Sequence, residues 1–181
     1  SDRTLKLPSD GDGTILTTNS SVGKIVQVKQ TVKTDTFSET VGNGAFSSVC
    51  ISCAFAATLS SSKLLIRAVL HVNSADQPTQ NGFAFTDDGN FIAAATGDAF
   101  GSQGRVSGSY GQVVTNEFTY PITQEYLHTI SDTNSHTYGV KLYSGSGYSN
   151  TTMGLNFGSG NTGATNRVRP ISTLTIMEVA A

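Results

Sequence analysis

The sequence predicts an all-β protein, and within that class an antiparallel β-sandwich of the jelly-roll type. The first observation is compositional: the 181 residues include 22 Ser, 24 Thr and 19 Gly, and only 13% are charged. A typical soluble domain has about 25% charged residues. The second observation is that apolar and polar residues alternate along several runs, which clusters of turn-forming residues separate. The third is that no amphipathic helical pattern exceeds one turn, since the run Ala93–Ala95 is short and Gly97 follows it.

Short strands are expected along most of the chain, about eight to ten in all. The expected strand runs lie at residues 24–32, 46–57, 62–72, 83–85, 91–92, 113–120, 126–130, 136–143, 153–157 and 171–179. Their alternation is typical of strands with one face in the core. The residues expected to share a face are Val26, Val28 and Val32 in the first run, Val49, Ile51, Cys53, Phe55 and Ala57 in the second, and Leu64, Ile66, Ala68, Leu70 and Val72 in the third.

Three other segments bear on the architecture. The last run carries Met177 on one face and Leu174 and Ile176 on the other, which is typical of a central strand or of a seam between subunits. The acidic pair Asp87-Asp88, followed by Gly89-Asn90, predicts a turn. Residues 96–112 are rich in Gly and Ser, and we expect a loop there.

The first 23 residues differ from the rest of the chain. They hold a short extended piece, an Asp- and Gly-rich turn and one small apolar pair, Ile15-Leu16. Such a segment cannot build a core of its own, so we expect a stalk or leader at residues 1–23 and a globular β-sandwich head at residues 24–181. The chain begins Ser1-Asp2-Arg3, without Met, and we expect a fragment or a processed product.

The charge pattern excludes some partners. The net charge is −2, and the densest basic spot is the pair Arg167 and Arg169, so we expect no nucleic-acid partner. No apolar run approaches about 18 residues, so we expect no membrane span. No signal peptide is visible either.

The two cysteines, Cys50 and Cys53, have the spacing of a redox or metal-binding pair. However, they lie in a strand-like run, where residues three apart point to opposite faces. A reactive pair normally begins a helix, and no second pair completes a zinc site. We therefore expect packed, free thiols, since a disulfide would need a bulge.

The usual catalytic motifs are missing from the sequence. Its Gly-Ser-Gly triplets at residues 145–147 and 158–160 are typical of loops, and no phosphate-binding loop or dinucleotide-binding pattern occurs. We therefore expect no enzyme, no metal and no cofactor. Asp10 and Asp12 could begin a calcium loop, but no acidic ligand completes it. His71, His128 and His136 are dispersed, and we expect surface or hydrogen-bonded histidines.

The candidate binding residues are tyrosines near loops. Tyr110, Tyr143 and Tyr148 lie at or beside Gly- and Ser-rich segments, where aromatic rings suit stacking on sugars. The alternative is that each ring covers its own loop. The three tyrosines, together with Asp87 and Asp88 in their predicted turn, form our candidate receptor-binding set. A catalytic role for the two carboxylates is the lesser alternative.

Two parts of the chain resemble bacteriophage proteins. The motifs TLKLP at 4–8, DGTILTT at 12–18 and NSS at 19–21 resemble the short repeat of phage tail fibres. The rest resembles C-terminal domains of structural proteins from marine phages, including those that infect cyanobacteria. The motifs that carry this second resemblance are GKIVQV at 23–28, TVKTD at 31–35, SSSKLLI at 60–66, YGVKL at 138–142 and STLTIMEV at 172–179.

This resemblance implies a virion appendage, such as the tip domain of a fibre. It implies a homotrimer that contacts other virion proteins and attaches to a host-surface glycan or outer-membrane receptor, and it brings no catalytic residues. Residues 74–112 depart most from the pattern, and we expect host specificity there. The alternatives are a capsid-surface or baseplate protein without host contact, a polysaccharide-degrading tail enzyme, and a lectin-like module of cellular origin.

Overall fold

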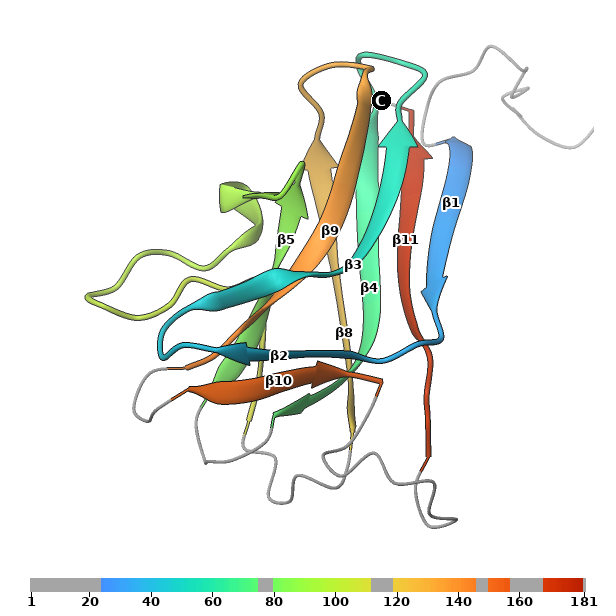
Figure 1. The fold of residues 1–181 in the computed structure, drawn as a ribbon. Coiled ribbons are helices and arrows are strands. Elements are labelled where there is room, and N and C mark those ends of the chain that lie inside the picture. The colour runs from blue at the N-terminus through green and yellow to red at the C-terminus, as the bar shows by residue number, and fades with distance from the viewer. Residues whose placement is uncertain (1–23, 75–79, 112–118, 146–149, 157–167, 181) are drawn as a thin grey trace, which may run out of the picture.

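The computed structural model describes residues 24–74, 80–111, 119–145, 150–156 and 168–180. These residues form eleven strands and one turn of 3-10 helix (Figure 1). The elements are β1 (Ile25–Lys33), β2 (Phe37–Val41), β3 (Phe46–Ala56), β4 (Lys63–Ser74), β5 (Asn81–Asp87), β6 (Asn90–Phe91), η1 (Ala93–Ala95), β7 (Gly108–Tyr110), β8 (Tyr120–Thr129), β9 (Ser135–Tyr143), β10 (Thr151–Leu155) and β11 (Ser172–Val179). Within these ranges, no helix could cross a membrane.

The strands form two antiparallel sheets that pack face to face. One sheet has the order β1-β11-β4-β10-β2, and β8 also pairs with β4. The other has the order β3-β9-β5-β6, and β7 also pairs with β5. This arrangement confirms the predicted all-β sandwich.

The jelly-roll topology follows from the order in which the chain visits the sheets. Eight strands form two sets of four, β1-β11-β4-β8 and β3-β9-β5-β7. The chain changes sheet at almost every step from β1 through β3, β4 and β5, then from β7 through β8 and β9 to β11. Two interlocked Greek keys of this kind define a jelly roll. Strands β2 and β10 are an added pair at one end of the first sheet (Figure 1).

The core fills the space between the two sheets. The predicted inward face of β4 is confirmed, since Leu64, Ile66, Ala68, Leu70 and Val72 are each at most 1% exposed. From the opposite sheet, the rings of Phe83 and Phe85 meet edge to face with centroids 5.8 Å apart. Strand β11 contributes Leu174 and Ile176, and it lies centrally between β1 and β4, as its two apolar faces predict.

Strand β1 is oriented opposite to the simplest interpretation of its alternation. Val28 and Val32 are 56% and 47% exposed, and so they lie on the outer face of the sheet. The polar side chain of Gln27 instead turns inward and donates a hydrogen bond of 2.8 Å to Glu178 on β11. The physical reason is that this edge of the sheet is lined by a buried carboxylate, which needs polar partners.

The pattern of β3 is broken by irregular pairing with β9. The register shifts between Phe46 and Val49 and again between Val49 and Ile51. Val49 therefore points outward, contrary to the expected shared face, and Cys50 points inward instead. Cys50 and Cys53 are free and buried, which confirms the expected packed thiols. Burial raises the pKa of the Cys50 thiol to about 12.

Two strands were not predicted, and several predictions lie outside the described residues. Strand β2 has no clear alternation, and β7 is a three-residue strand inside the segment predicted to be a loop. The expected stalk at 1–23, the Asp10 and Asp12 pair and most of the expected strand at 113–120 lie outside the described residues.

Candidate functional site

The site begins at the tight turn between β5 and β6. Asp88 and Gly89 both have positive φ, at 47° and 79°. Two central residues with positive φ make a type I′ turn, whose twist matches that of a β-hairpin, and Asp-Gly is one of its preferred sequences. The predicted turn is therefore confirmed, and it sets two carboxylates side by side at one end of the sandwich.

Asp87 ends a row of side chains that face the core. Residues two apart on a strand share a face, and the row runs from Phe83 through Phe85 to Asp87. Strand β9 continues the same layer, because Tyr138 pairs with Asp87. His136 is two residues before Tyr138 on β9 and therefore lies on the same face of the sheet. The inward-facing layer thus changes from aromatic to ionisable at this end of the sandwich.

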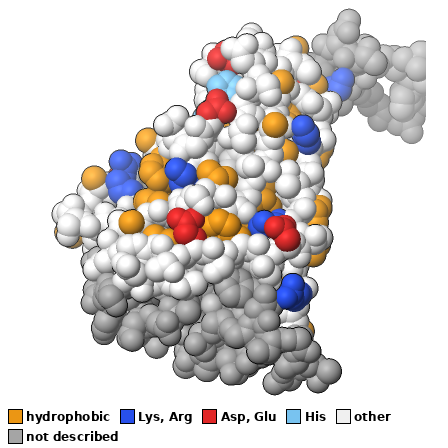
Figure 2. Space-filling view, in the orientation of Figure 1, with side chains coloured by type: hydrophobic (Ala, Val, Ile, Leu, Met, Phe, Trp, Pro, Cys, Tyr) orange, Lys and Arg blue, Asp and Glu red, His pale blue; other side chains and the backbone are white. Residues whose placement is uncertain are grey.

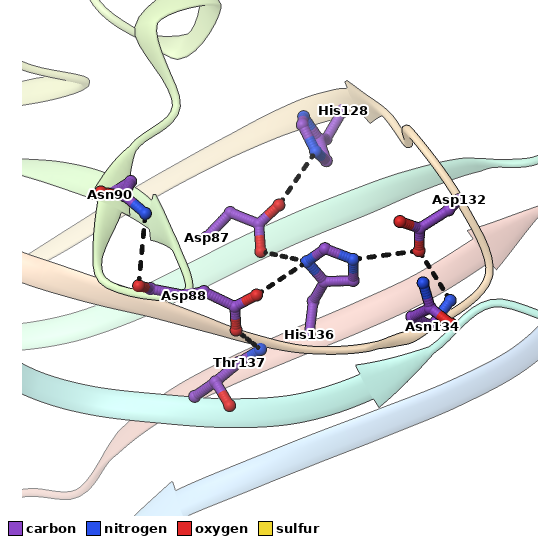
Figure 3. Close-up of polar contacts among 8 residues, drawn as sticks. All are labelled: Asp87, Asp88, Asn90, His128, Asp132, Asn134, His136 and Thr137. Carbon is purple, nitrogen blue, oxygen red and sulfur yellow. Dashed lines mark hydrogen bonds and ion pairs between the residues drawn. The ribbon is translucent and has the colours of Figure 1, made fainter.

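His136 lies between three carboxylates (Figure 3). Its Nδ1 atom is 2.8 Å from Asp87 Oδ1 and 3.0 Å from Asp88 Oδ2. Its Nε2 atom is 3.1 Å from Asp132 Oδ1, in the β8–β9 connection. The other oxygen of Asp88 accepts a hydrogen bond of 2.7 Å from the amide of Thr137. The Asp88 carboxylate therefore contacts both His136 and the Thr137 amide, and the His136 imidazole contacts carboxylates through both of its nitrogens.

The opposite sheet contributes a second histidine. His128 faces inward from the end of β8, and its Nε2 atom lies 4.0 Å from Asp87 Oδ2 (Figure 3). Its ring also meets that of Tyr138 edge to face, with centroids 5.8 Å apart. Asp87 therefore stands between two histidines, one from each sheet.

The two histidines have opposite electrostatic surroundings. The hydrogen bond to Asp132, helped by Asp87, raises the pKa of His136. Burial lowers the pKa of His128, although Asp87 acts in the other direction. At neutral pH His128 is therefore the more readily neutral of the two, with a ring nitrogen lone pair available.

A cleft of about 520 Å³ opens beside this cluster. Its lining combines the ionisable groups with apolar surface from β6, η1 and β8. The lining residues are Asp87, Asp88, Asn90, Phe91, Ile92, Ala93, Ala94, Tyr126, His128, Thr129 and His136. Figure 2 shows a histidine side chain between acidic side chains at this end of the molecule. Small-molecule sites have volumes of this order and similar linings.

Of the four candidate receptor-binding residues that the structure describes, Asp87 and Asp88 lie together and Tyr110 and Tyr143 lie apart from them. Tyr110 is 7% exposed, and burial strongly raises the pKa of its hydroxyl. Tyr143 is 8% exposed, and its ring packs against that of Phe46 at 4.8 Å. Both rings are therefore largely buried, which leaves little of either ring for stacking on a ligand. Tyr148 lies outside the described residues.

The sequence did not assign His128, His136 or Asp132 to a site. Their only signal was indirect: a turn at 131–135 joins two strands, and this short connection leaves His128 and His136 at the same end of the sandwich. What places His136 beside Asp87 is the pairing of β9 with β5, a contact between segments 49 residues apart, whereas His128 approaches from β8 in the opposite sheet.

Comparisons with known proteins add little about function. No protein-family model matches the chain, and no curated protein matches it. Among solved structures, one of infectious bursal disease virus strain Gx matches with a TM-score of 0.42 and 16% identity, over 97% of this chain and 43% of that one. One of strain Gt matches with a TM-score of 0.36 and 13% identity, over 97% and 41%. The chain thus spans less than half of either matched protein, and TM-scores below 0.5 are too low to support a functional conclusion.

Proposed function

We propose that this chain is a virion structural protein, the tip domain of a phage fibre, which assembles with copies of itself as a trimer. The observation that carries the proposal is the orientation of β1, in which Val28 and Val32 face solvent while Gln27 turns inward to Glu178. A strand of this kind is costly in a monomer, because apolar side chains stay in water. The cost disappears if a second copy covers that face.

The valines of β1 belong to a surface that extends across four strands. Val28 pairs with Met177, which pairs with Leu65, which pairs with Leu127. Paired residues of antiparallel strands share a face, so these four side chains form one row on the outside of the β1-β11-β4-β8 sheet. Leu127, at the far end of the row, is 47% exposed. We call this surface the outer apolar face.

A second row widens the same surface. Val32 pairs with Thr173, Thr173 with Val69, and Val69 with Thr123. Between the two rows lies a polar row, in which Gln30 pairs with Thr175, Thr175 with Arg67, and Arg67 with Glu125. The face therefore places apolar side chains on both sides of a polar row with one basic and one acidic residue, a pattern that is compatible with contact between identical subunits.

The outer apolar face is large enough for a stable contact. Four strands at about 4.8 Å spacing and about nine residues at 3.3 Å each cover roughly 550 Å². Two such faces packed against each other would bury roughly 1,100 Å², just above the approximately 1,000 Å² expected of a specific interface, and in a trimer each face would be shared between the two neighbouring copies. A second copy of this chain is the occupant that we propose.

Separate observations support the fibre location, the trimer and host attachment. These are the phage-like motifs at residues 4–21 and 172–179 and the jelly-roll topology, a fold that also occurs in binding modules. Attachment would use the end of the sandwich that carries Asp87, Asp88 and the cleft. Cell-binding assays with the wild type and with an Asp87→Asn, Asp88→Asn double variant test that part separately.

The mass of the chain in solution, measured by light scattering after gel filtration, tests the assembly. We expect a mass three times the chain's 18.9 kDa. Leu127→Lys places a charge in the outer apolar face and should give monomers. The matched control is Leu59→Lys in the β3–β4 connection, since Leu59 is 43% exposed and lies off that face. A wild-type monomer at micromolar concentration, or the same mass for both variants, would contradict the proposal.

A polysaccharide-degrading enzyme is the second candidate, because the cleft is lined by two carboxylates. Glycosidases place their two carboxyl groups on opposite sides of the bond that breaks. Here Asp87 and Asp88 both approach the same nitrogen of His136, which fits that role poorly. Release of reducing ends from host capsular polysaccharide, lost in Asp87→Asn, would favour the enzyme.

A further inference from the structure

We propose that Asp87, Asp88 and His136 form a binding site for a divalent first-row transition-metal ion of the Zn²⁺ class. Each of these three residues offers one ligand atom, and the three atoms all lie within 4.8 Å of one another. The site lies at the end of the β3-β9-β5-β6 sheet, at the rim of the cleft. It is separate from the outer apolar face, so it does not depend on how the chain assembles.

The strongest argument is that two carboxylates approach one imidazole nitrogen. Nδ1 of His136 is 2.8 Å from Asp87 and 3.0 Å from Asp88, yet an imidazole nitrogen carries at most one proton. Only the contact with Asp87 has hydrogen-bond geometry. A metal ion at the centre of the group would interact with all three ligand atoms at once, whereas a proton cannot.

The spacing of the ligand atoms suits a small ion. Bonds of about 2.0–2.2 Å in a tetrahedral zinc site place ligand atoms about 3.3 Å apart. The separations of 2.8 and 3.0 Å therefore need to open by only a few tenths of an ångström. Calcium needs six to eight oxygen ligands at longer distances, which three side chains including an imidazole do not supply.

The surroundings supply the other requirements of a metal site. Three carboxylates face one imidazole here, so the cluster carries excess negative charge. His128, from the opposite sheet, lies 4.0 Å from Asp87 Oδ2, which makes it a candidate fourth ligand after a small movement. The cleft gives an ion access from solvent and leaves room for a water ligand. Asp132 holds Nε2 of His136 and so orients the ring, as the outer partners of metal-bound histidines do.

Calorimetric titration of the metal-free full chain with ZnCl₂ at neutral pH tests the proposal, with Co²⁺ absorption as a second readout. We expect one ion per chain and the intense visible bands of Co²⁺ with a low coordination number. His136→Ala and Asp88→Asn should each weaken binding at least about tenfold. Asn at residue 88 keeps an oxygen for the Thr137 amide, so this variant should fold even if His136→Ala does not.

The matched control is His71→Ala, which removes a histidine from the outer side of β4. Its Nδ1 atom contacts the carbonyl of Ile171 at 2.8 Å and lies outside the cluster. This variant should bind Zn²⁺ as the wild type does. The proposal is overturned if the wild type binds no ion, or if Asp88→Asn binds as tightly as the wild type. Loss of binding in His71→Ala alone would also overturn it.

Discussion

The side-chain amide of Gln27 donates a hydrogen bond of 2.8 Å to the carboxylate of Glu178, across the pair of strands β1 and β11. Glu178 is fully buried. Its carboxylate also accepts hydrogen bonds from the backbone amides of Thr58 and Leu59, at 2.9 and 3.0 Å. One buried carboxylate therefore ties β1, β11 and the β3–β4 connection together, and it explains why the polar face of β1 points inward.

Replacing Glu178 with Gln should destabilise the fold. The substitution keeps the shape but removes the charge and turns an amide donor toward the amides of Thr58 and Leu59. Because the substitution leaves buried donors without an acceptor, we expect it to lower the free energy of unfolding by about 2–3 kcal/mol. Urea unfolding followed by circular dichroism measures the loss. Asp98→Asn, in the exposed connection between η1 and β7, is the control and should change stability by less than about 0.5 kcal/mol.

The same carboxylate should make the fold sensitive to acid. Burial acts to raise the pKa of Glu178, but hydrogen bonds from Gln27 and from the amides of Thr58 and Leu59 outweigh it and lower the pKa from 4.5 to about 2. A lowered pKa in the folded state means that the stabilisation is complete above pH 4.5 and is lost as the pH falls toward 2.

The expected loss in acid is about 3 kcal/mol. Unfolding free energies measured between neutral pH and the acid range test this expectation. The wild type should lose stability through that window, and Glu178→Gln should lose correspondingly less. If both proteins follow the same curve, Glu178 does not carry the acid sensitivity.

The fold was predictable from the sequence where one face of a strand is in the core. Strand β4 shows this most clearly, since every second residue from Leu64 to Val72 is buried. At β1 the alternation identified the two faces of the strand but did not say which one is covered, and Val28 and Val32 lie on the outer face. The prediction was wrong at Val49, because irregular pairing in β3 exchanges the faces and no sequence pattern marks the irregularity.

The candidate site was only half predictable. Asp87 and Asp88 stood out because an acidic pair before Gly predicts a turn. His136 could not be placed beside them, since pairing of β9 with β5 depends on the whole topology. The tyrosines near loops were a weaker signal, because a tyrosine at a strand end such as Tyr143 can turn its ring onto the sheet, as it does against Phe46.

The type I′ turn should depend on its glycine. Gly89 has a φ of 79° and open space around it, so Ala there meets no atom but takes a strained backbone conformation. We expect Gly89→Ala to lower the free energy of unfolding by about 1 kcal/mol. The matched control is Gly97→Ala, where the space is also open and φ is not positive. Chemical denaturation compares the two variants, and equal stabilities would contradict the assigned turn type.

Thiol labelling of a Val28→Cys variant tests the central claim most directly, because it reports whether the outer apolar face is covered in solution. The native Cys50 and Cys53 are buried and should not compete for the reagent. Leu59→Cys, outside the face, is the reference. The account predicts that at micromolar concentration Val28→Cys reacts at least about tenfold more slowly than Leu59→Cys, and that dilution removes the difference. Equal labelling rates at all concentrations would show that the face is free in solution and would contradict the account.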